Sequence, residues 1–105
     1  MNYNLNAFVT KDLVEQKKKI GFMYREKNDN PNDSGWRFFS GDEPQEYVDN
    51  ADNIIICSLN DVINSIDSSI EQYLNSEIGT AFERMDENSA FLEIKNFTFE
   101  NKQNW

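Results

Sequence analysis

The sequence predicts a single α+β domain, a mostly antiparallel sheet of about five strands with two or three short helices. Three observations predict this class. Short alternating or β-branched segments recur along the chain, an apolar stripe with helical spacing runs through residues 59–74, and strand pairs joined by polar turns stand in both halves. We expect residues 1–105 to form one domain, with an ordered core at about 7–99 and a tail at 100–105.

The first elements are predicted to be a strand and a short helix. Residues 7–9 are apolar, and Thr10 is a residue type that suits a helix N-cap. The helix is expected to point Leu13 and Val14 inward. It should end at the lysines of residues 17–19, because cations favour the negative end of a helix dipole.

A long-loop hairpin is expected next. Residues 20–26 alternate as a strand does, with Ile20 and Tyr24 on the same face. Residues 27–34 are rich in Asn, Asp, Pro and Ser, which favour turns. The aromatic residues 36–39 then form the returning strand, and most of them are expected in the core.

The middle of the chain predicts one helical turn, a strand and a broken helix. Pro44 can begin a turn of helix in the acidic connection 40–53. The run Ile-Ile-Ile-Cys at 54–57 is typical of a central strand covered on both faces. Apolar residues in 59–74 follow helical spacing, but Ser68 starts a capping-box pattern, so two short helices are expected.

The last third predicts another hairpin. Residues 80–85 and 90–95 flank the polar turn 86–89. Phe97 and Phe99 alternate beyond it. With strand hairpins in both halves, we expect the helices to cover one face of the sheet.

The net charge of −9 is unevenly distributed and excludes several kinds of partner. Residues 38–83 contain ten acidic residues and no Lys or Arg. A phosphate backbone needs clustered cations, so nucleic-acid binding is not expected. No apolar run is long enough to span a membrane, and no secretory leader is visible, so we expect a cytoplasmic protein.

The residue types needed for most catalytic chemistry are scarce. The chain has no His and a single Cys, Cys57, which follows three isoleucines and is expected to be a buried structural thiol. The polar loop around residues 29–35 approaches a calcium-loop pattern, but Gly41 stands where a bidentate Glu is required, so an Asx turn is expected. We expect no enzyme activity, no metal and no cofactor.

The acidic connection is the strongest candidate for a binding surface. A charge-complementary face would attract a basic protein, although acidity can also serve solubility alone. Tyr47 or Trp36 could anchor such an interface. The predicted contact residues, called the acidic patch below, are Asp42, Glu43, Glu46, Tyr47, Asp49 and Asp52.

Several ordered motifs carry a resemblance to a known family. They are Gly21–Glu26, Asp33–Glu43, Tyr47–Asn53, Leu59–Asn60 and Ala81–Arg84. Over about residues 7–95 the chain resembles a bacterial immunity-protein family, immunity protein thirty-three of the polymorphic toxin systems, formerly a domain of unknown function. The resemblance implies an intracellular antidote that binds a cognate toxin, and such partners are often basic. It supplies no binding residues, and the Gly-Trp-x-Phe-x-x-Gly motif can serve the fold itself.

Two alternatives remain open. The first is an enzyme or small-ligand-binding domain that uses the loop 27–34 with Arg25, Arg37 and Asp33 lining a pocket. The second is a regulatory or adaptor module without a toxin. The sequence leaves the oligomeric state undetermined, and neighbouring genes would distinguish the alternatives best.

Overall fold

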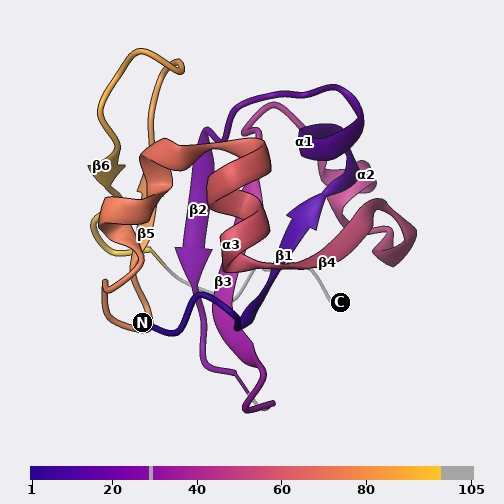
Figure 1. Ribbon diagram of the computed structural model, residues 1–105. Coiled ribbons are helices and arrows are strands. Elements are labelled where there is room, and N and C mark those ends of the chain that lie inside the picture. The colour runs from indigo at the N-terminus through magenta and orange to yellow at the C-terminus, as the bar shows by residue number, and fades with distance from the viewer. Residues whose placement is uncertain (29, 98–105) are drawn as a thin grey trace.

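A computed structural model describes residues 1–28 and 30–97 and shows a six-stranded mixed sheet (Figure 1). The order of the strands across the sheet is β4-β1-β3-β2-β5-β6. Their bounds are β1 Asn6–Thr10, β2 Phe22–Arg25, β3 Asp33–Phe39, β4 Ile54–Ser58, β5 Ala81–Glu83 and β6 Leu92–Glu93. The α+β class is confirmed, with one strand more than the five expected.

All the strand pairs of this sheet are antiparallel except β1 with β3, which run parallel. Both expected hairpins are present, β2 with β3 and β5 with β6. The first strand of the chain enters the sheet between β3 and β4, with Ala7 opposite Cys57 and Val9 opposite Phe38. This long-range pairing makes the sheet mixed.

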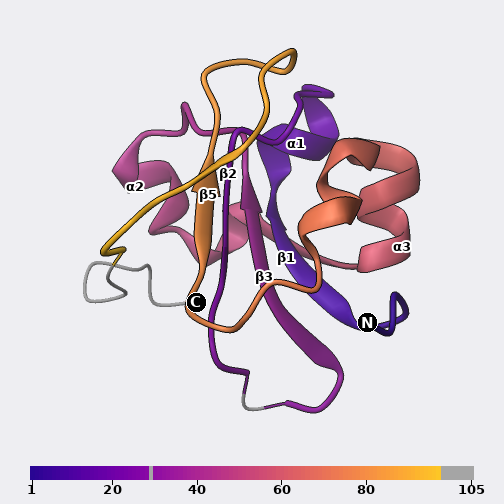
Figure 2. The ribbon, with the colours of Figure 1, turned by 90° about the vertical axis from the view of Figure 1, so that its left-hand side faces the viewer.

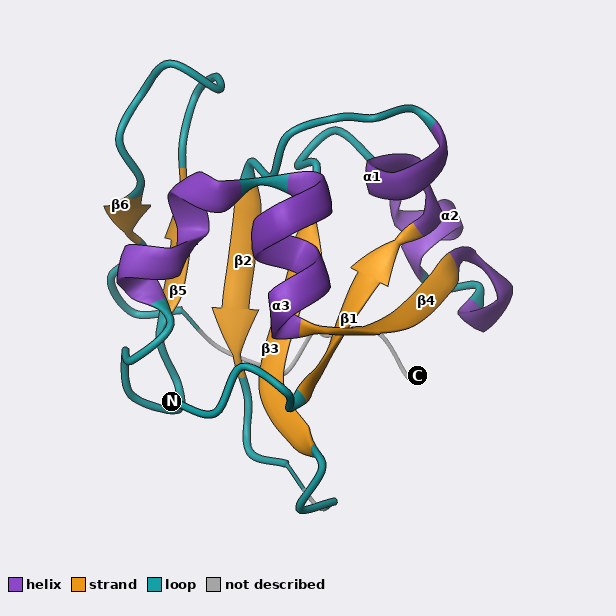
Figure 3. Cartoon of the chain, viewed as in Figure 1, coloured by secondary structure: helices purple, strands orange, loops and turns teal. Residues whose placement is uncertain are grey.

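Helical segments lie on both faces of the sheet, so the expectation of a single covered face is wrong (Figure 2). One face carries a helical stretch that follows β4, and the other carries α2. The bounds are α1 Lys11–Glu15, α2 Gln45–Val48, the 3₁₀ turn η1 Ala51–Asn53, α3 Leu59–Asp61, the π-helical turn η2 Val62–Ile66 and the 3₁₀ segment η3 Ser68–Tyr73 (Figure 3). In the described residues, no helix is long and apolar enough to cross a membrane.

The sheet divides the core into two clusters. The larger one lies under the α3–η3 stretch, and Trp36 at its centre is fully buried, with its indole N–H donating to the Leu74 carbonyl at 3.1 Å. The smaller cluster on the opposite face contains Tyr24, Phe39 and Val48. The expectation that the aromatic strand residues are core is therefore confirmed. The possible role of Trp36 as an interface anchor is excluded.

The first helix differs from the prediction. It ends at Glu15, two residues before the first lysine of the run, because Lys17 takes a left-handed backbone conformation with φ of 53°. The ammonium of Lys19 instead donates to the Ile66 carbonyl at 3.1 Å. Leu13 is buried as expected, but Val14 is exposed. Ile20 lies outside β2 and joins the larger cluster, on the opposite side of the sheet from Tyr24.

β4 is an edge strand, so the prediction that residues 54–57 are central is wrong. β4 pairs with β1, and Ile56 is 62% exposed. A continuous apolar run indicates that the side chains of the strand are at least partly buried, but it does not indicate whether one or two other strands pair with it.

The predicted break in the helical stripe is confirmed, with a different capping residue. Asp67, rather than Ser68, precedes η3, and its carboxylate accepts from the Ser69 amide at 3.0 Å. The same carboxylate accepts from the Ile20 amide at 3.1 Å and pairs with the Arg84 guanidinium at 2.6 Å. This buried side chain therefore joins the helical stretch to the segment just before β2 and to the residue that directly follows β5. The predicted strand residue Phe99 and the tail lie outside the described residues.

Candidate functional site

The acidic patch lies on one continuous stretch, the loop before α2, α2 itself and η1. Pro44 precedes α2, as the sequence predicts. Glu46, Asp49 and Asp52 are exposed, and the Asp49 carboxylate accepts from the Gln45 side-chain amide at 2.9 Å. These three residues present their negative charge to solvent.

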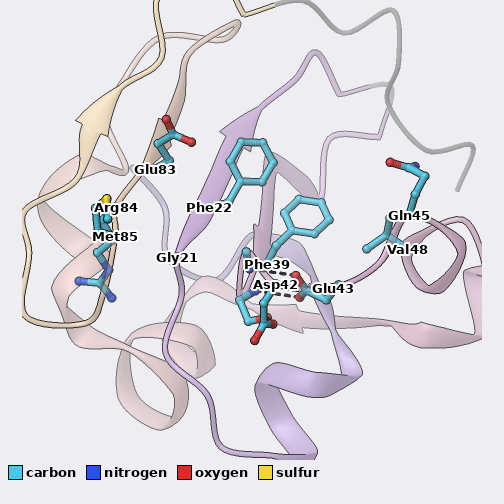
Figure 4. Close-up of a pocket in the computed structure, with 12 residues that line it drawn as sticks. Gly21, Phe22, Phe39, Asp42, Glu43, Gln45, Val48, Glu83, Arg84 and Met85 are labelled. Atoms are coloured by element: carbon cyan, nitrogen blue, oxygen red, sulfur yellow. Dashed lines mark hydrogen bonds between the residues drawn. The ribbon is translucent and has the colours of Figure 1, made fainter.

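Glu43 has a structural role that the sequence does not reveal. Its carboxylate accepts from the Ser40 amide at 2.8 Å and from the Gly41 amide at 2.9 Å (Figure 4). It also accepts a third hydrogen bond, from the Thr10 hydroxyl at 2.8 Å. Thr10 is fully buried at the end of β1. Glu43 therefore ties the loop before α2 to the sheet, and Thr10 uses its hydroxyl there instead of capping α1.

Asp42 and Tyr47 are also partly engaged with the protein. The Asp42 carboxylate accepts from the Ser40 hydroxyl at 2.5 Å and pairs with the Lys18 ammonium at 3.3 Å. These two contacts hold the pKa of Asp42 below its ordinary value. The Tyr47 hydroxyl accepts from the Asp12 amide at 3.1 Å, which joins α2 to the first turn of α1.

A groove of about 500 Å³ opens beside the patch (Figure 4). Phe22 and Phe39, with ring centroids 5.3 Å apart, lie between Glu83 on one side and Glu43 on the other. Met85, 94% exposed, also lines this groove, called the α2 groove below. An apolar floor with carboxylates on its rim suits a protein partner that offers both apolar and basic side chains.

Sequence reasoning missed the apolar part of this site. Phe22 is read from the sequence as an ordinary strand residue, and its place in the groove depends on the arrival of β5 beside β2. The only local signal is Met85, an apolar residue directly before the polar turn 86–89. An apolar side chain in that position would be expected to remain in solvent.

The residues of the alternative ligand pocket bind one another. The guanidinium of Arg37, 4% exposed, donates to Glu26 at 2.7 Å and to both oxygens of Asp33 at 2.9 and 2.8 Å. It also lies 3.9 Å from the ring centroid of Phe8. Burial alone would raise the pKa of Asp33, but hydrogen bonds from Arg37 and a backbone amide hold it below its ordinary value. This network is a buried structural element.

Arg25 and the polar loop 27–34 also bond to other groups of the protein. Arg25 donates to the backbone carbonyls of Ser34 and Ser76 at 3.0 and 2.8 Å. In the loop, the Asn32 amide donates to the Asn30 side chain at 2.8 Å, which confirms the expected Asx turn. These contacts disfavour the small-ligand interpretation, because the proposed pocket residues already have protein partners.

The described residues offer little chemistry for catalysis or metal binding. They contain no group of three or more Cys, Asp or Glu side chains placed to hold a metal ion. Cys57 is half-buried, and burial first, then the charge of Asp61, raises the pKa of its thiol to about 11. A thiol with that pKa is protonated at neutral pH and is a poor nucleophile.

Comparison with known protein families matches residues 7–95 to the model of the Immunity protein Imm33 domain. The match covers most of the chain, including every described strand from β1's second residue through β6. It agrees in extent with the resemblance drawn from the sequence motifs. Comparisons with curated proteins and with solved structures gave no match.

Proposed function

Because the chain belongs to the Imm33 immunity protein family, we propose that it neutralises a cognate bacterial toxin by binding it through the acidic patch. Membership of this family indicates an immunity function, a toxin as partner and a non-enzymatic role. The observation that carries the finer proposal is the exposed charge of Glu46, Asp49 and Asp52 on one short stretch beside the α2 groove.

The proposed binding mode has two parts. The exposed carboxylates attract a basic toxin surface and raise the association rate. Apolar contact at Phe22 and Met85 then holds the complex, because desolvated apolar anchors supply most of the affinity at protein interfaces. Glu43 and Tyr47 position the patch through their bonds to β1 and α1. The protein is proposed to act in the cytoplasm, without a cofactor.

The test reverses the charge of three exposed acids in one variant, Glu46→Lys with Asp49→Lys and Asp52→Lys. The partner is the toxin encoded beside the gene, and the association rate is measured at low and at physiological salt. We expect the reversal to slow association at least tenfold at low salt and less at high salt, because salt screens exposed charges.

A matched control reverses three exposed acids elsewhere, Glu77, Glu87 and Glu93, and so changes the net charge equally. This control should keep most of the wild-type association rate. Equal slowing in the two variants would show that overall charge, not the patch, governs binding. An unchanged rate in the patch variant would show that the toxin binds another surface.

A further inference from the structure

Among the described residues, no strand pairs with the outer edge of β4. Among the described strands β4 pairs with β1 alone, in a regular register of five residues without a bulge. Its residues Ile54–Ser58 include no charge and no proline. Edge strands are normally shielded by charges, prolines or bulges, because open backbone groups pair readily with another chain. β4 has none of these devices.

The pairing with β1 determines which backbone groups face outward. Just beyond the strand, the Leu59 amide donates to the Leu5 carbonyl at 2.9 Å. Hydrogen-bonded pairs recur at every second residue of an antiparallel ladder, so Cys57 and Ile55 direct their backbone groups toward β1. The N–H and C=O of Ile56 consequently point away from the sheet.

A second groove, of about 620 Å³, lies beside this edge and is called the β4 groove. Ile55 and Cys57 of β4 line it, together with Val14 of α1 and Ile66 of η2. A strand added to β4 would direct every second side chain to this face of the sheet. Its other side chains would lie beside the exposed Ile56. The edge therefore offers backbone pairing and an apolar receiving surface together.

Charge distinguishes the possible occupants of this edge. Asp52 precedes β4 by two residues and Asp61 follows it by three, and both are exposed. Antiparallel pairing of two copies would bring Asp52 of one copy close to Asp61 of the other, in a protein of net charge −9. The lysines at 17–19 also line the β4 groove and outnumber its single acidic residue, Asp61, which disfavours basic side chains inside it. Cations of a partner are best placed at the two ends of the strand.

We propose that β4 is a docking strand. An extended segment of a partner protein, apolar at alternate positions and basic at both ends, adds to the sheet as a seventh strand beside β4. The identification of this partner as the toxin rests on the proposed function. The docking itself rests on the open edge, the β4 groove and the flanking carboxylates.

The experiment uses the full chain and the synthetic peptide Arg-Val-Thr-Val-Thr-Val-Arg, with binding followed by NMR and by hydrogen exchange. We expect saturable binding, protection of the Ile56 amide, and at least tenfold weaker binding of the same peptide with Glu at both ends. Two N-methylated peptides, blocked at alternate sets of amides, should differ: one set faces β4 and abolishes binding, and the other leaves it.

Two substitutions at Ile56 distinguish the contribution of its backbone N–H to peptide binding from the contribution of its side chain. Ile56→Pro removes the outward N–H while leaving the ladder to β1 intact, and should weaken peptide binding at least tenfold. Ile56→Thr keeps that N–H and should weaken binding less. If the proline variant does not fold, the pair of N-methylated peptides still decides the question.

The following results would overturn the inference: no protection of the Ile56 amide, equal binding of the basic-ended and acidic-ended peptides, or pairing of β4 with a second copy in solution. Absent peptide binding alongside toxin binding that depends on the acidic patch would refute the docking strand and leave the proposed function standing. If the protein binds the peptide but does not bind the toxin encoded beside its gene, the proposed function is refuted and the docking strand is not.

Discussion

Replacing Glu43 by Ala tests whether this acid holds the fold together or belongs only to the surface. Its carboxylate accepts from Thr10, Ser40 and Gly41, and so connects β1 to the loop before α2. Its neighbour Asp42 carries the same charge in the same loop, but contacts the partly exposed side chain of Lys18. The two acids therefore form a matched pair of substitutions.

The expected cost follows from what each substitution leaves behind. Without Glu43, the buried Thr10 hydroxyl loses its acceptor, which costs about 1–3 kcal/mol. The Ser40 and Gly41 amides can turn to water, so each adds roughly 0.5 kcal/mol. The Glu43→Ala variant should lose about 2–4 kcal/mol of unfolding free energy. Asp42→Ala breaks an exposed ion pair and should lose about 0–1 kcal/mol.

Urea denaturation at pH 7, followed by circular dichroism, measures both variants against the wild type. Glu43→Ala should lower the urea midpoint without changing the slope, because the same surface is exposed on unfolding. Its Tm should fall by roughly 10 °C or more. The structural role of Glu43 would be refuted if Glu43→Ala and Asp42→Ala lost the same unfolding free energy to within about 0.5 kcal/mol, which is roughly the contribution of one weak hydrogen bond.

Two further predictions concern the core. Asp67→Ala leaves the buried Arg84 unpaired and should cost about 3–5 kcal/mol at pH 7. Burial raises the pKa of Asp67, but hydrogen bonds and the charge of Arg84 lower it overall. The stability that this carboxylate contributes is present above about pH 4 and is lost as the pH falls through its lowered folded-state pKa, so the difference between wild type and variant in urea titrations should shrink as the pH falls below about 4. Gly35 has φ of 89°, and an added Cβ would collide with the Glu26 carbonyl, so Gly35→Ala should lower the unfolding free energy by at least about 2 kcal/mol. Gly79 also has a positive φ but has open space around it, so Gly79→Ala should lower it by about 1 kcal/mol. Thermal unfolding measures both variants, and equal losses would contradict the collision at Gly35.

Local patterns predicted the elements whose partners lie nearby in the sequence. The alternation in residues 20–26 and the aromatic run 36–39 predicted β2, β3 and their hairpin, because a turn-rich loop joins them directly. The helical stripe in residues 59–74 and its interruption were also predicted correctly. In these segments, local propensity and tertiary packing favour the same structure.

The errors arose where a distant residue determines the structure. Nothing within residues 54–57 indicates that β1 covers one edge of β4 and leaves the other open. Lys19 leaves the expected helix end to reach the Ile66 carbonyl, 47 residues away in sequence. In the candidate site, the acids are visible in the sequence, but the contact between Glu43 and Thr10 depends on a separation of 33 residues. The sequence therefore predicted the charge of the acidic patch but not the long-range hydrogen bonds that hold it in place.

The position of β1 also constrains how the molecule is assembled during synthesis. Among the described strands β1 comes first in the chain, and both of its neighbours in the sheet, β3 and β4, come later, with β2 between β1 and β3 in sequence. The emerging strand stays unpaired on both edges until its neighbours leave the ribosome, and closing such long loops slows folding. A chain interrupted before β4 would retain the hairpin but leave one edge of β1 unpaired, so the sheet cannot be completed until β4 and the later strands β5 and β6 have been made.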